Sequence, residues 1–342
     1  MKKQYITILL TIIITSAVYH GIETAYFAIS QNVEKSTNVQ KSSDDNKTSL
    51  IEEKHTLKEK LHDSPVLSNQ SGVRIQSRAS LRSRKNFKYA TISDLDMGEG
   101  LGPYTDIDFS HCRIYNILLD SMGEVERCNF SNCSIYFGNI KHPSNTLDFS
   151  DAFFHSGVTL LHVDQNMLIQ TQNFKEKDFL CCIEDVYCEK VDFSNFIFRN
   201  GIDGNFPFCD FSNARILGGI IGQGVLKGLS KQQFCSTWNY RNKIFLNLRI
   251  FGILEEHVTD PDMRYRNIDF KDFVFYNCFF GDILIAANLS NCRFIQCDLS
   301  HSTNLTVEQI KSTWNYKNNR MDLIKLPPNL QKYFDEEKKE KE

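Results

Sequence analysis

The sequence has little tryptophan and proline, and it lacks the short motifs that mark common catalytic and metal sites. Its 342 residues include only two Trp and seven Pro, and no two of its 11 Cys form a CxxC pair. Structural zinc sites normally use such closely spaced thiols, so the pattern excludes a typical zinc site. GxSxG, phosphate-loop, HExxH and calcium-loop motifs are also missing. We therefore predict a protein that is not an enzyme, with no catalytic residues, no metal and no cofactor.

A strong charge of one sign is also missing. The net charge is -3, and residues 1–86 hold 13 Lys/Arg and 8 Asp/Glu of the totals of 39 and 42. The remaining 256 residues therefore carry 26 and 34, which makes a mildly acidic body behind a basic leader. So weak a charge does not indicate a nucleic-acid partner, and we expect none.

The chain begins with a hydrophobic segment of the kind used for export. Lys2 and Lys3 precede an apolar run from Tyr5 to Tyr19, which predicts a signal anchor or a signal peptide at residues 1–30. The run is shorter than the ~20 residues that span a bilayer, so cleavage after a small-residue site and burial as a core segment stay open. Anchoring makes the membrane a partner and places the body outside the cytoplasm; cleavage would make it secreted or periplasmic.

Two polar segments flank the body. Residues 31–86 contain no aromatic side chain and bury too little apolar surface to offset the entropy of ordering, which predicts a disordered tether. Within it, Arg74, Arg78 and Arg82 would line one side of a transient helix and could touch anionic lipid or glycan, although a solvated linker is the simpler interpretation. The charged residues 331–342 predict a disordered tail.

One short phrase recurs along the body. It has a small or apolar residue, Asp or Asn, Phe or Leu, and then two mostly polar residues before the next small or apolar one. The copies are IDFSHC (107–112), CNFSNC (128–133), LDFSDA (147–152), VDFSNF (191–196), CDFSNA (209–214), IDFKDF (268–273), ANLSNC (287–292) and CDLSHS (297–302). The period is five, with irregular stretches at 116–127, 157–163 and 201–208.

The phrase predicts an extended stretch followed by a corner. In CNFSNC, Cys128 and Phe130 lie two residues apart and face the same side, while Asn129 faces solvent. Ser131 and Asn132 then suit a turn. Successive coils would stack the central residues about 4.8 Å apart, each contributing about 1.5 to 3 kcal/mol on burial. The predicted core comprises Phe109, Phe130, Phe149, Phe193, Phe211, Phe270, Phe275, Phe280, Leu289, Phe294 and Leu299.

These phrases make the chain resemble the pentapeptide-repeat family, over most of residues 105–305. The resemblance implies an all-β solenoid, a right-handed quadrilateral parallel β-helix with about twenty residues per coil. With the flanking segments, we expect a hydrophobic N-terminal helix, a disordered linker and then the β-helix at 87–330.

Three polar inserts predict short helices between coils. They are Asp164–Phe179, Ser230–Phe245 and Thr306–Met321, and the last two begin with the capping-box pairs Ser230/Gln233 and Thr306/Gln309. Each insert would close a group of coils. We therefore divide the β-helix into the modules 87–181, 182–255 and 256–330.

Two residue sets remain as candidate sites. Cys278 with Cys297, and Cys112 with Cys133, would stack on neighbouring coils, either as disulfides in an oxidising compartment or as reduced core thiols. Trp238, Tyr240, Trp314 and Tyr316 occupy equivalent places in two inserts. They would form an aromatic binding surface for a sugar or peptide, or pack against the coils.

The sequence favours a non-catalytic scaffold or binding module, tethered to a membrane and presenting a rigid β-helix to a protein or glycan partner. Two alternatives stay open. One is a nucleic-acid mimic that modulates a nucleic-acid enzyme, a role that the resemblance allows. The other is an uncharacterised β-helix enzyme.

Overall fold

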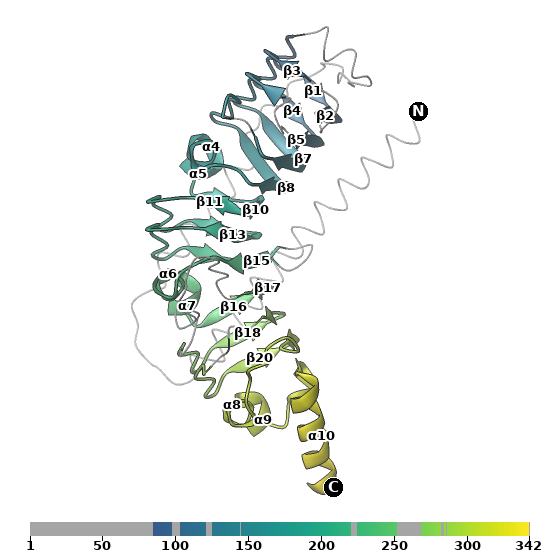
Figure 1. Cartoon of the computed structure of the whole chain (residues 1–342), viewed down its shortest axis with the longest axis vertical. Helices are drawn as coiled ribbons and strands as arrows, with labels where there is room; N and C mark the ends of the chain where they lie inside the picture. The colour runs from purple at the N-terminus through teal and green to yellow at the C-terminus, as the bar shows by residue number, and fades with distance from the viewer. Residues whose placement is uncertain are drawn as a thin grey trace, which may run out of the picture. The chain divides into compact units, whose positions relative to one another are not determined.

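The computed structural model describes residues 85–97, 103–120, 125–143, 145–219, 224–251, 268–281, 284 and 286–341 as a solenoid of parallel strands (Figure 1). The predicted anchor at 1–30 and nearly all of the predicted tether lie outside these residues. In the part of the chain that is described, no helix is long and apolar enough to cross a membrane.

Within the described residues the strands form five parallel sheets. In space, the first contains β1 (Thr91–Ile92), β4 (Arg113–Ile114), β7 (Ser134–Lys141), β5 (Ile117–Asp120) and β2 (Leu95–Met97), with β8 (Phe153–Leu161) and β10 (Cys182–Glu184) continuing from β7. The second contains β11 (Val186–Tyr187), β13 (Gly201–Asn205), β15 (Gly224–Lys227), β17 (Leu248–Ile250), β19 (Phe279–Phe280), β21 (Cys297–Asp298) and β22 (Ile324–Lys325).

The smaller sheets are β9 (Asp178–Phe179) with β12 (Ile197–Phe198) and β14 (Arg215–Ile216), β16 (Ile244–Leu246) with β18 (Val274–Tyr276) and β20 (Arg293–Ile295), and β3 (Tyr104–Thr105) with β6 (Val125–Glu126). The helices are α4 (Gln165–Gln170), α5 (Gln172–Lys175), α6 (Lys231–Ser236), α7 (Trp238–Arg241), α8 (Val307–Ser312), α9 (Trp314–Lys317), the 3-10 helix η3 (Met321–Leu323) and α10 (Pro328–Lys341).

A column of stacked side chains fills the solenoid. Phe109 lies 4.9 Å from Phe130, and Phe130 lies 5.0 Å from Phe149, measured between ring centroids of near-parallel rings. Every residue in the predicted core set is at most 1% exposed. The column also extends one coil further toward the N-terminus than the repeat phrases, because Phe87 stacks on Phe109 at 5.3 Å.

The polar residues of the phrase build the corner. In CNFSNC the carbonyl of Phe130 accepts from the amide of Cys133 at 3.3 Å, and Asn132 has φ of 57°, a left-handed conformation that Asn adopts more readily than most residues. The Asn129 carboxamide accepts from the Ser131 amide at 2.9 Å. The same contact, from residue i+2 to the Asp or Asn side chain, recurs at Asp108, Asp148, Asp192, Asp210, Asp269, Asn288 and Asp298.

Three helix pairs, α4 with α5, α6 with α7 and α8 with α9, interrupt the coils where the inserts predicted helices. Both capping boxes are present, and Asp164 caps α4 by accepting from the Met167 amide. A Thr at the junction of each pair caps the second helix and is fully buried: Thr171, Thr237 and Thr313. In Figure 1 the three pairs lie on the same edge of the solenoid.

A buried asparagine in each pair spans the gap that the helices open between strands. The Asn315 carboxamide oxygen accepts from the Phe294 amide at 2.8 Å, and its nitrogen donates to the carbonyls of Phe294 at 2.8 Å and Arg320 at 3.2 Å. Asn239 makes the equivalent contacts with Ile216 and Ile244, and Asn173 with Phe154 and Asp178. One side chain thus supplies the hydrogen bonds that a neighbouring strand would supply.

The prediction of a disordered tail at 331–342 is wrong, because most of these residues belong to the helix α10 (Pro328–Lys341). Leu330 and Phe334 are buried, and the Phe334 ring packs on Tyr316 at 5.6 Å. Tyr316 also donates to the Glu337 carboxylate at 2.9 Å. Leu330 and Phe334 are four residues apart, a spacing that places them on one side of a helix, and the high charge of the segment obscures this pattern in the sequence.

We predict that Asn315→Ala lowers the free energy of unfolding by about 2 to 4 kcal/mol, because it leaves the buried amide and carbonyl of Phe294 without partners. Urea denaturation and amide hydrogen exchange at Phe294 measure the effect. Asn318→Ala, which removes one exposed contact to the Trp314 carbonyl, is the control and should cost under about 1 kcal/mol. Equal stability of the two variants would contradict the bridging role.

Candidate binding surface

The aromatic residues predicted as a binding surface pack against neighbouring coils and against α10. The Arg215 guanidinium lies over the Trp238 ring, 4.6 Å from its centroid, and an equivalent arginine, Arg293, covers Trp314 at the same distance. Tyr240 donates to the Asp269 carbonyl at 2.9 Å. The two Trp–Tyr pairs lie on separate helices, Trp238 and Tyr240 on α7, and Trp314 and Tyr316 on α9.

The predicted cysteine pairs lie on neighbouring coils. In each pair the later thiol donates to a backbone carbonyl of the preceding coil, as from Cys297 to Phe275 at 3.3 Å, and all 11 thiols are free. The Cys133 thiol also contacts the Phe109 carbonyl at 3.0 Å. Burial and the Cys297 thiol raise the pKa of Cys278, which favours the unreactive protonated form.

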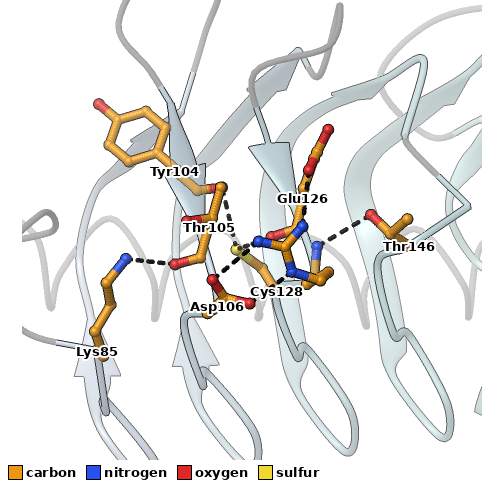
Figure 2. A network of polar contacts seen from close by, with 8 residues as sticks. Lys85, Tyr104, Thr105, Asp106, Glu126, Cys128 and Thr146 are labelled. Carbon is orange, nitrogen blue, oxygen red and sulfur yellow. Dashed lines mark hydrogen bonds and ion pairs between the residues drawn. The ribbon is translucent and has the colours of Figure 1, made fainter.

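A charged cluster joins coils near the start of the solenoid (Figure 2). The Arg127 guanidinium binds both oxygens of Asp106, at 2.7 and 3.0 Å, and contacts Glu126 at 2.9 Å. Lys85 donates to the Thr105 carbonyl. The hydrogen bond from Arg127 lowers the pKa of Asp106, so this carboxylate is poorly suited to act as a general base near neutral pH. The cluster links coils rather than presenting a reactive group.

A second surface consists of outward aromatic and aliphatic residues on β5, β7, β8 and the turn before β5. We call Tyr115, Leu118, Tyr136, Phe137 and His155 the aromatic strip. Tyr115 stacks on Tyr136 at 4.9 Å, and Tyr136 on His155 at 4.0 Å, with near-parallel rings. Leu118 is 43% exposed and Phe137 is 55% exposed. Stacked coils therefore carry apolar groups on the outside as well as in the core.

An irregularity in strand pairing positions Phe137. Ile135 pairs with Phe154, but Phe137 pairs with Gly157, so two residues of β8 face one residue of β7. A β-carbon on Gly157 would lie 2.2 Å from Cδ1 of Phe137. The Phe137 ring therefore lies directly over the Gly157 backbone, a position that any larger residue would block. Bulges of this kind commonly redirect a side chain.

Most side chains around the strip are uncharged, although Asp96 of β2 pairs with Leu118. Its neighbours on the same strands and turns are Asn116, Ser134, Asn139, Phe153, Ser156 and Thr159, with the charged Arg113, Asp120 and Lys141 at its margins. Burial lowers the pKa of His155 to about 4, so its imidazole is neutral at pH 7. The strip is thus an aromatic surface without a formal charge at its centre.

The repeat phrase did not predict the strip, because its residues lie outside the phrase. A signal was present in the one-coil spacing of Tyr115, Tyr136 and His155, which are 21 and 19 residues apart. The irregular stretches at 116–127 and 157–163 adjoin the same surface. The sequence thus departs from the repeat close to the residues that form the strip.

Among the described residues, no group of three or more His, Cys, Asp or Glu side chains is arranged to hold a metal ion. No protein-family model matches the chain, and no curated protein sequence matches it either.

We predict that mass spectrometry of the unreduced, denatured protein finds 11 alkylated thiols, because the paired cysteines are held as hydrogen-bonded core thiols. A mass lower by about 2 Da for a bridged peptide containing Cys112 and Cys133, or Cys278 and Cys297, would contradict this expectation. Protein reduced before alkylation serves as the reference for complete labelling.

We predict that His155 makes stability pH-dependent. The native pKa of about 4 lies below the ordinary value of 6.5, so the unfolded state binds the proton more tightly. Stability is then fully present above pH 6.5 and falls as the pH drops from 6.5 toward 4, by on the order of 2 kcal/mol. His155→Phe should keep the stacking and reduce the loss, measured by urea denaturation at pH 7 and pH 4.5. An identical loss in both proteins would exclude His155 as its source.

Proposed function

We propose that the chain is a non-catalytic scaffold or binding module of the pentapeptide-repeat type. Its solenoid would be a right-handed, four-sided β-helix, tethered to a membrane through residues 1–30 and presented outside the cytoplasm to a protein or glycan partner. The stacked residues Phe109, Phe130 and Phe149 lie 21 and 19 residues apart. That spacing supports a coil with four sides of about five residues each.

The observation that carries this proposal is the aromatic strip. The solenoid does not need these side chains for its core, since Phe137 and Leu118 are largely exposed while the neighbouring inward residues Ile135 and Leu119 are completely buried. Exposed apolar groups that gather on one surface are characteristic of interaction sites. The strip lies on paired strands, so a partner would find it already formed.

The carboxylates of the repeat support a non-catalytic role. Asp108, Asp148 and Asp192 each accept a backbone amide within their own turn. A side chain held in this way serves the corner of the coil, and the same use accounts for the recurrence of Asp in the phrase. It also argues against the nucleic-acid mimic, which would need a dense acidic surface, because these carboxylates are spaced by the coil and the net charge is only -3.

The location can be tested by adding protease to intact cells that express the full chain with a C-terminal tag. We expect the tag and solenoid to be digested without permeabilisation, because residues 1–30 direct the body across the membrane. A cytoplasmic protein in the same cells is the control and must stay intact. Protection of the tag until the cells are opened would contradict an external location. It would favour the alternative, a nucleic-acid mimic in the cytoplasm.

A further inference from the structure

The exposed ring of Phe137 is a flat apolar surface that rests on the paired strand β8. One side of the ring lies against Gly157, and the side chain is 55% exposed. The backbone of β7 is paired on both sides, with β5 through Gly138 and with β8 through Gly157. This pairing holds the backbone beneath the ring in place. It also leaves no unpaired edge of β7 to which a peptide strand could add.

The polar groups closest to Phe137 in the strand pairing are uncharged. Tyr136 and Tyr115 contribute hydroxyls, Asn139 a carboxamide and Thr159 a further hydroxyl, and Asn139 and Thr159 are direct partners in the β7–β8 pairing. His155 is neutral because burial lowers its pKa to about 4. Anionic polymers such as nucleic acids are bound mainly through Lys and Arg. Strands β5, β7 and β8 carry one such residue, Lys141 at the end of β7, and Arg113 lies on the neighbouring β4.

We propose that the aromatic strip binds a neutral carbohydrate chain. The apolar C–H face of a pyranose ring would stack on Phe137, while sugar hydroxyls would exchange hydrogen bonds with the Tyr136, Asn139 and Thr159 side chains. Aromatic rings with an apolar face beside polar groups suit ligands of this mixed character. The inference rests on the proposed binding function and names the ligand class for the same surface.

Binding of purified full-length protein to cellohexaose, mannohexaose and chitohexaose tests the ligand class, with heparin and polygalacturonate as charged probes. The detergent must be zwitterionic, because a sugar headgroup would compete. We expect at least one neutral oligosaccharide to bind, and Phe137→Ala to weaken its affinity at least about tenfold. Phe137→Tyr should retain binding and Phe137→Leu should lose it, because stacking requires an aromatic face.

Phe208→Ala is the matched control. This phenylalanine is 80% exposed and lies outside the strip, so its loss should leave the affinity unchanged. Thermal unfolding of each variant establishes that the fold is intact. The proposal is overturned if none of the neutral oligosaccharides binds, if only the charged polymers bind, or if Phe137→Ala and the parent bind equally.

A photo-crosslinking residue at Asn139 separates failure of the ligand class from failure of the binding function. If the neutral oligosaccharides do not bind and the cross-linker captures one protein in native membranes, the carbohydrate proposal is wrong and a protein partner is supported. If neither the oligosaccharides nor any macromolecule is captured at the strip, the strip is not a binding surface, and the observation that carries the proposed function is lost as well.

Discussion

Parallel stacking in register is the constraint on which the rest of this structure depends. Each coil donates and accepts hydrogen bonds along the stack, and each inward residue lies near its counterpart on the next coil. Phe109 and Phe130 illustrate the arrangement, since their rings are parallel and 4.9 Å apart. Any residue added to one coil therefore disturbs pairing on both sides unless another group restores it.

The structure restores pairing in two ways. Where a helix pair separates two strands, as between β14 and β16, the carboxamide of a buried asparagine, Asn239, contacts both. Where β8 has one residue too many, Gly157 leaves room for the Phe137 ring. The first solution hides the irregularity in the interior, and the second exposes it. The candidate binding surface lies at the exposed irregularity.

Much of this fold could be predicted from the sequence because the repeat encodes short-range rules. Residues two apart share a side, Asn and Asp form corners, and Ser or Thr with Gln caps a helix; Phe130, Asn132 and Ser230 follow these rules. Asn173 and Phe137 do not, because their roles depend on residues of other coils. The helix α10 was missed for a related reason, since the burial of Phe334 depends on its contact with Tyr316.

The asparagine bridges also bear on how the molecule would respond to force along its axis. Strand-to-strand pairing between β14 and β16 is replaced by three hydrogen bonds from one side chain, whereas strands such as β16 and β18 share a continuous ladder. Bonds that are few and concentrated in one group rupture together. The neighbouring side of the stack keeps its ladder past α6 and α7, because β15 pairs with β17. A pulled solenoid would therefore open first on the side of the helix pairs, while the continuous sheet holds its coils together.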